Sequence, residues 1–223
     1  MDWTAVALSL RLAMIVTGVL LVAGVPIAYW LTFSTWRGKF LVESLVALPL
    51  VLPPTVLGFY VLVAIGSRSP LGQAWLALTG SPLAFTFKAL VIASVLYSLP
   101  FAVQPIASSF ALVDRGLLEA SATLGASPLT TFRRVVLPLS RDGIITGAVL
   151  TFAHTIGEFG VVLMVGGNLP GETRTISIAI YDEVQAVNLT RAQLTALALL
   201  LFSFTALAIV YGTIRKPWTV PHA

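Results

Sequence analysis

Long apolar stretches alternate along the chain with short segments that hold most of its charged residues. A helix that crosses a membrane needs about 20 mostly apolar residues. Five stretches reach this length, and they occupy residues 12–33, 41–65, 89–112, 144–165 and 194–212. The pattern therefore predicts an all-α fold, a polytopic transmembrane helical bundle of about five spans, in which residues 1–223 form a single domain.

The composition supports a membrane protein and argues against several soluble classes. Of the 223 residues, 57% are hydrophobic and 10% are charged, whereas an average soluble domain carries about 25% charged residues. The formal net charge of +4 does not indicate nucleic-acid binding, because the lysines and arginines are scattered between apolar stretches. The chain has no cysteine and two distant histidines, His154 and His222, so neither a thiol site nor a zinc cluster is expected.

Most lysines and arginines fall in loops on one side of the predicted bundle. An excess of these residues marks the cytoplasmic side. Eight lie on the side that also holds the C-terminus: Arg37, Lys39, Arg115, Arg133, Arg134, Arg141, Arg215 and Lys216. The other side holds five, which are Arg11, Arg68, Lys88, Arg174 and Arg191. The distribution predicts an inner-membrane protein with an external N-terminus and a cytoplasmic C-terminus. The first span is expected to be retained, because no basic region or cleavage site of a signal peptide is found.

The longest predicted cytoplasmic segment, residues 113–143, contains two short helices. Gly125 interrupts the first helical pattern, and glycine readily adopts the left-handed conformation that ends a helix. Ser127 and Pro128 predict a new start, with serine as the N-cap and proline in the first helical position. Pro138 is expected to end the second helix. The pattern therefore predicts a pair of short helices at the cytoplasmic surface.

The same segment resembles the signature loop of ABC importer permeases, whose pattern is Glu-Ala-Ala, three residues, Gly, nine residues, Ile, any residue, Leu-Pro. Here Glu119, Ala120 and Ser121 are followed by Gly125 and then by the Val-Val-Leu-Pro run that ends at Pro138, with the same spacing. In that family the loop docks into a groove of the ATPase subunit, so the resemblance implies a coupling role here. The coupling candidates are Glu119, Ala120, Ser121, Gly125, Ser127, Leu129, Phe132 and Pro138. The alternative is an amphipathic surface hairpin without a special function.

Two further regions resemble the molybdate or tungstate members of this permease family. One is the proline-rich run at residues 48–58, and the other comprises the Gly-Glu-Phe-Gly run at residues 157–160 together with residues 167–176. The resemblance covers about residues 8–212 and implies the type I ABC importer permease fold. It also implies a homodimer, an external substrate-binding protein, an oxyanion substrate, and cytoplasmic ABC ATPase subunits that hold ATP and Mg, with no cofactor on this chain. Sulfate or thiosulfate permeases are the alternative, because they share the coupling loop.

Three prolines make the second predicted span a candidate for lining the translocation pathway. Pro49, Pro53 and Pro54, followed by Thr55, leave carbonyl groups that only protein or a water-filled cavity can satisfy at membrane depth. The alternative is a kink buried against a neighbouring helix.

The third predicted span offers neutral hydrogen-bond donors for an oxyanion. Ser98 and Gln104 carry hydroxyl and amide groups, which bind an anion without the full charge pairing that would trap it. Serine is also common at ordinary interfaces between membrane helices, so helix packing is the alternative.

The fourth predicted span holds an acidic residue deep in an apolar segment. Glu158 should face the bundle interior and have a partner, because an intramembrane charge costs about 2.5 to 3.5 kcal/mol on insertion scales. His154 lies four positions earlier on the same predicted helix face and can reach it. A structural or gating role is favoured over anion contact, and Gly157 and Gly160 would allow close helix approach or a hinge. An intramembrane enzyme is the rival class, but this pair lacks both a nucleophile and a third metal ligand.

The predicted external loop, residues 166–193, offers charged candidates for contact with a binding protein. These candidates are Glu172, Arg174, Asp182 and Glu183. The alternative is an ordinary solvated loop, which would have the same composition.

Overall fold

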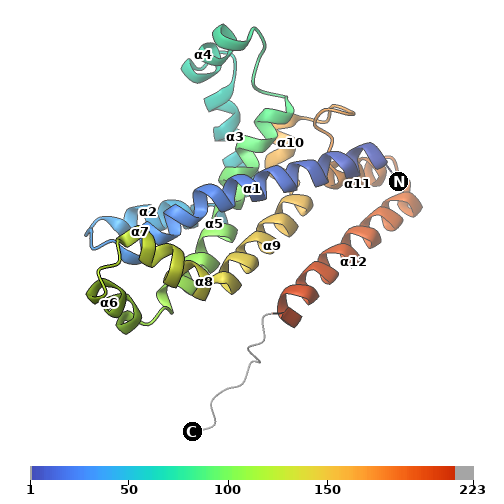
Figure 1. Ribbon diagram of the computed structural model, residues 1–223. Helices are drawn as coiled ribbons and strands as arrows, with labels where there is room; N and C mark the ends of the chain where they lie inside the picture. The colour runs from blue at the N-terminus through green and yellow to red at the C-terminus, as the bar shows by residue number, and fades with distance from the viewer. Residues whose placement is uncertain (1, 214–223) are drawn as a thin grey trace.

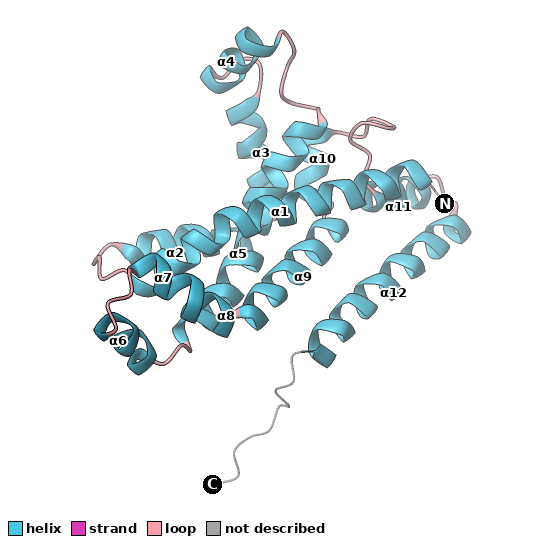
Figure 2. Cartoon of the chain, in the orientation of Figure 1, coloured by secondary structure: helices cyan, strands magenta, loops and turns pink. Residues whose placement is uncertain are grey.

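The computed structural model describes residues 2–213, and within this range the chain is helical and contains no strand (Figures 1 and 2). The helices are α1 (Trp3–Phe33), α2 (Lys39–Ala47), η1 (Leu48–Leu50), α3 (Pro54–Ile65), α4 (Pro70–Thr79), α5 (Phe87–Ala111), α6 (Arg115–Thr123), α7 (Pro128–Thr131), η2 (Phe132–Val136), α8 (Leu137–Leu139), α9 (Arg141–Gly157), α10 (Gly160–Gly166), α11 (Ile176–Gln185) and α12 (Leu189–Thr213). Of these, η1 is a 3-10 turn and η2 is a π-helical turn.

Three helices of the described chain, α1, α5 and α12, are each long and apolar enough to cross a membrane. Two bent pairs raise the total to as many as five: residues 39–50 meet α3 at 111°, and residues 128–139 meet α9 at 70°. The all-α membrane fold with about five spans is therefore confirmed. The first bend lies within the second predicted span, whereas the second bend lies at Ser140, in the segment predicted to be cytoplasmic.

The second predicted span, residues 41–65, is interrupted in the middle. η1 ends at Leu50 and α3 begins at Pro54. Proline has no amide hydrogen and its ring clashes with the preceding turn, so Pro53 and Pro54 cannot continue a helix that arrives from Leu50. Pro54 instead occupies the first position of α3, where the missing donor would have had no intrahelical partner. The chain therefore turns sharply at this point.

The fourth predicted span, residues 144–165, is also interrupted. α9 ends at Gly157, Glu158 has an extended backbone with φ −65° and ψ 134°, and α10 begins at Gly160. Glycine has a low helix propensity, and a glycine stands on each side of the break. α9 extends further than expected at its other end, because it begins at Arg141 directly after α8.

The helices α1, α5 and α9 pack together at the centre of the bundle (Figure 1). Leu8, Leu12 and Val16 recur every four residues on α1 and are buried in one cluster with residues of α5, α10 and α11. The outer part of α1 is also fixed by a polar contact, since Ser9 Oγ accepts a 2.8 Å hydrogen bond from the Ile176 N–H at the start of α11.

The bundle has two different ends (Figure 1). α4, α11 and the N-terminus lie at one end, and α6, α7 and the loop after α1 lie at the other. The second end carries the residues predicted to be cytoplasmic: Arg37, Lys39, Arg115, Arg133, Arg134 and Arg141. Two further residues of that set, Arg215 and Lys216, lie outside the described residues.

The last helix, α12, contacts α9 and α11 and otherwise stands beside the bundle (Figure 2). Only 11% of its most apolar 18-residue window is buried. Its exposed side chains are large and apolar, including Leu194, Leu197, Leu200, Leu201 and Phe204. Such a surface requires lipid or another subunit against it.

Candidate functional site

The two helix breaks lie directly against each other. A Cβ atom on Gly160 would lie 2.7 Å from Pro54 Cβ, which is closer than real Cβ atoms approach. A Cβ atom on Gly58 would lie 2.8 Å from Met164 Cβ and 3.2 Å from Val161 Cα. α3 and α10 therefore pack with almost no space between them. The structure thus brings together pathway candidates from the second and fourth predicted spans.

The other candidates at the first break differ in their exposure. Pro49 is buried in η1, which packs against α5. Pro53 and Thr55 are exposed on the surface of the subunit. The first break is therefore packed against α5 at Pro49 and exposed at Pro53 and Thr55.

Glu158 lies in the second break with 4% of its surface exposed. Within residues 2–213 neither carboxyl oxygen has a partner in good hydrogen-bond geometry, and the hydroxyl of the buried Ser94 on α5 is the candidate donor near it. The structure does not pair Glu158 with His154, because the helix ends at Gly157 and the extended backbone removes the spacing of one helical turn. The subunit therefore contains a buried carboxyl group whose hydrogen-bonding capacity is largely unused.

His154 is held by α5 instead. Its Nδ1 lies 3.0 Å from Ser98 Oγ, and its ring stacks on Phe101 with centroids 4.0 Å apart and an interplanar angle of 24°. The Tyr97 ring lies 4.9 Å away. Ser98 Oγ is also 3.1 Å from Thr155 Oγ1. The sequence analysis did not predict this network, although the adjacent polar residues His154 and Thr155 in an apolar span indicated a polar contact.

Gln104 lies apart from Ser98. Six residues of helix place the two side chains on different faces of α5, and Gln104 is exposed whereas Ser98 is fully buried. Gln104 lines a cavity of about 540 Å³ between α2, α5 and the end of α1, together with Ser108 and Lys39. Lys39 Nζ is 3.8 Å from a carboxylate oxygen of Glu43 in the same cavity.

The coupling segment has the predicted caps. Gly125 has a φ of +74°, in the left-handed region. Ser127 Oγ accepts a hydrogen bond from the Thr130 N–H, and Pro128 is the first residue of α7. Ser121 Oγ lies 2.7 Å from Thr131 Oγ1, which ties α6 to α7. The glycine corner between the two helices is therefore a defined structure.

The second short helix ends one residue after Pro138, close to its predicted end. The helical path continues through α8 to Leu139. It does so because η2 is a wide π-helical turn, in which the Leu137 N–H bonds to Phe132 O, five residues back. Pro138 then sits near the start of α8, where its missing N–H is tolerated.

Coupling candidates face two directions. Leu129 is 57% exposed and Leu124, one residue before Gly125, is 86% exposed. Phe132 instead packs inward, with its ring 5.0 Å from Tyr29 and 6.1 Å from Phe110. The corner thus presents apolar side chains outward, while Phe132 anchors it to α1 and α5.

At the opposite end, the loop that is predicted to be external is fastened by polar contacts. Asn168 Nδ2 donates to the Asp182 carboxylate at 2.8 Å, and Arg174 Nε donates to Asn168 Oδ1 at 2.7 Å. Arg174 Nε is also 3.5 Å from Asp182 Oδ2. Two of the predicted binding-protein contacts, Arg174 and Asp182, are therefore tied to each other. Glu183 pairs with Arg191 at 4.0 Å.

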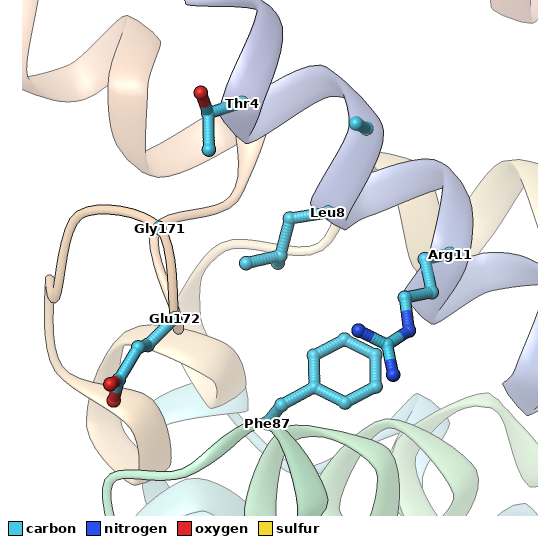
Figure 3. Close-up of a pocket in the computed structure, with 7 residues that line it drawn as sticks. Thr4, Leu8, Arg11, Phe87, Gly171 and Glu172 are labelled. Carbon is cyan, nitrogen blue, oxygen red and sulfur yellow. The ribbon is translucent and has the colours of Figure 1, made fainter.

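Glu172 lines a cavity of about 440 Å³ at this end (Figure 3). The Arg11 guanidinium lies 4.6 Å above the centre of the Phe87 ring, and Glu172 extends from the loop on the other side of the cavity (Figure 3). This cation–π contact holds the arginine side chain at the rim.

Replacing Asp182 by alanine should loosen this loop. Arg174 would lose its ionic partner and Asn168 its acceptor, and a hydrogen bond to a charged group contributes about 1.5 to 3 kcal/mol. Trypsin cleavage after Arg174 should therefore be at least about tenfold faster in detergent-solubilised protein. The control is Glu183→Ala, because its partner Arg191 is 69% exposed and such surface pairs are weak. Equal cleavage of both variants would contradict the fastening role.

The sequence and the fold resemble those of several known proteins. Residues 21–216 match the family described as binding-protein-dependent transport system inner membrane component. The molybdenum transport system permease protein ModB of Azotobacter vinelandii is 50% identical over 214 residues, covering 96% of this chain and 95% of that protein. ModB of Escherichia coli is 40% identical over 82% of this chain and 80% of its own length. A solved structure of the MetNI methionine ABC transporter, in inward-facing conformations, has a chain that matches with a TM-score of 0.70 and 18% identity, covering 96% and 97% of the two chains.

Proposed function

Because the chain belongs to the family of binding-protein-dependent transport system inner membrane components, we propose that it is the membrane-spanning subunit of an ATP-driven molybdate importer. The observation that carries the proposal is the 50% identity to a molybdenum permease over nearly the whole length of both chains. Tungstate, which is also a tetrahedral dianion, fits the same description. The chain is a permease and not an enzyme, and the rival intramembrane enzyme is set aside.

ATP hydrolysis belongs to separate cytoplasmic ABC subunits, which would hold ATP and Mg, and this chain would bind no cofactor of its own. The coupling segment supports such a partnership, because Leu124 and Leu129 are exposed and Glu119 adds an exposed charge on α6. Apolar side chains exposed on a rigid corner are typical of a docking surface.

The coupling segment is joined to the membrane core by α9. α8 ends at Leu139 and α9 begins at Arg141, and α9 then runs to Gly157 beside the second helix break. A displacement of the docked corner would move α9 and change the contact between α3 and α10. Alternating access would follow from this movement.

The permease would work as a homodimer, with its N-terminus external and its C-terminus cytoplasmic. Three to five spans are too few to enclose a pathway, whereas two copies supply twice that number. The polar exposed residues Gln104 and Ser108 on α5 support a water-filled or protein-covered space at this face. An external binding protein would deliver the oxyanion at the end that holds the Glu172 cavity.

Uptake by the complete complex in proteoliposomes tests the proposal. The complex contains the permease, the ATPase and the loaded binding protein, with ATP enclosed. We expect labelled molybdate to accumulate, unlabelled tungstate to compete, and a hundredfold excess of sulfate to have little effect. Preferential uptake of sulfate would make the sulfate or thiosulfate permease the correct assignment.

A further inference from the structure

We infer that His154 contacts the oxyanion in the translocation pathway, and that a proton is bound at its Nε2 atom whenever this contact forms. The inference rests on the proposed function. It concerns a residue that the sequence suggested only as a partner for Glu158.

The His154 ring lies beside a stripe of side chains on α5. Tyr97, Phe101, Gln104 and Ser108 are spaced by four, three and four residues, so they form one stripe along α5. Gln104 and Ser108, at the C-terminal end of the stripe, are polar and exposed. These side chains must contact water or protein, because lipid cannot form hydrogen bonds with them. His154 packs on the two aromatic residues of this stripe and is only partly buried. The ring therefore borders the same face.

The hydrogen bonds around His154 determine which ring nitrogen carries the hydrogen. Three contacts run in a chain: His154 Nδ1 to Ser98 Oγ at 3.0 Å, Ser98 Oγ to Thr155 Oγ1 at 3.1 Å, and Thr155 Oγ1 to Thr151 O at 2.8 Å. Each contact needs one hydrogen, and the two hydroxyl groups supply two. The carbonyl only accepts, so Thr155 donates to it and Ser98 donates to Thr155. The third hydrogen must come from Nδ1, which donates to Ser98.

The other ring nitrogen, Nε2, is then an acceptor. A neutral imidazole with its hydrogen on Nδ1 has only a lone pair on Nε2. No hydrogen-bond partner of Nε2 occurs in the described part of the chain. An oxygen of a fully ionised oxyanion is also only an acceptor. Contact between the two therefore requires one proton, taken from solvent, which converts the imidazole to an imidazolium and makes Nε2 a donor.

Few other titratable groups lie near the ring. Tyr97 is in contact with it, and Glu158 follows four residues later. The remaining charged residues of α1, α5, α9 and α12 lie toward the ends of their helices: Arg11, Lys88, Arg141, Asp142 and Arg191. α10 has none. Lys39 of α2 lines the cavity beside Gln104 and Ser108, but its ammonium lies 3.8 Å from the Glu43 carboxylate. The imidazolium would therefore be the cation on this face that has no carboxylate partner.

Nitrogen NMR of the permease labelled with 15N-histidine tests the hydrogen assignment directly. The sequence has only two histidines, so a His222→Ala variant assigns the signal of His154. In the complete complex without substrate, Nδ1 should be protonated and Nε2 should not. With loaded binding protein, a non-hydrolysable ATP analogue and excess molybdate, both nitrogens should become protonated. Ser98→Ala should release the constraint and allow the Nε2–H tautomer in the absence of molybdate.

Uptake by His154→Phe tests the contact. Phenylalanine can keep the stacking with Tyr97 and Phe101, and Ser98 can still donate to Thr155, so a purely structural role predicts normal uptake. Loss of a charge-assisted hydrogen bond predicts a fall of at least about tenfold. His154→Gln, which has a neutral amide donor, should recover part of this loss. Association with the ATPase serves as the measure of correct folding for both variants.

Three results would overturn the inference: a substrate-free His154 with its hydrogen on Nε2, nitrogen signals that molybdate leaves unchanged in a complex that transports it, or wild-type uptake by His154→Phe. A wild-type complex that transports no oxyanion would instead refute the proposed function, and the substrate-free tautomer would still report whether the hydrogen count is correct.

Discussion

Replacing Gly160 by alanine should remove most transport while leaving the protein in the membrane. The added Cβ would lie 2.7 Å from Pro54 Cβ and 3.7 Å from the Pro54 carbonyl carbon. A proline ring at the first position of a helix cannot rotate away, so α3 and α10 must separate. Overpacking of this kind costs about 1 to 3 kcal/mol, and it acts on the contact expected to change during transport. We expect molybdate uptake to fall at least about tenfold.

Gly157→Ala is the matched control. This glycine ends α9 on the other side of the same break, and a Cβ there would meet no atom within 4 Å. Uptake should stay within about twofold of wild type, as for substitutions that make no new contact. Equal loss in both variants would mean that the break needs glycine for flexibility, and that the contact with Pro54 does not control transport.

Replacing Gly125 by valine should separate the permease from its ATPase. No atom lies within 4 Å of a Cβ built at this position, so space is not the obstacle. The obstacle is the φ of +74°, which a β-branched residue adopts only at a cost of about 1 to 3 kcal/mol. The corner would relax to another conformation and Leu124 would move. Co-purification of the ATPase and uptake should both fall about tenfold or more.

The Gly125→Asn variant distinguishes the effect of backbone conformation from the effect of side-chain size. Asparagine is larger than alanine but tolerates the left-handed region. This variant should therefore retain most ATPase binding, whereas Gly125→Ala should fall between Asn and Val. Full co-purification and uptake by Gly125→Val would contradict the coupling assignment.

The structural features that depend only on neighbouring residues were predicted best from the sequence. The caps at Ser127 and Pro128 and the left-handed Gly125 are local, because each is decided by the conformational limits of one residue and by atoms within three or four positions. The apolar spans were predicted equally well in number, since their length follows from the thickness of the bilayer. The prolines and glycines also indicated where the helices would be interrupted.

Contacts between distant segments were not predictable in the same way. The pairing of His154 with Glu158 was inferred from helical spacing, but the helix ends between them and Ser98, 56 residues away, takes the contact instead. The π-helical turn at Phe132–Val136, just before Pro138, was also not predicted. The fastening of Asn168 to Asp182 depends on how the loop folds back onto α11. Such outcomes depend on tertiary packing, which local propensity does not contain.

The hydrogen bond between Ser9 and Ile176 has a consequence for biosynthesis. The two residues are 167 positions apart, and ribosomes add about 5 to 20 residues per second. The first helix would therefore wait on the order of ten seconds in the membrane before its partner is synthesised. During this interval its buried stripe must be shielded by lipid, by the insertion machinery or by the later helices as they arrive. If the ribosome stalls before residue 176, the first helix of the nascent chain is inserted but cannot form its hydrogen bond to Ile176. Membrane quality control would encounter the chain in this form.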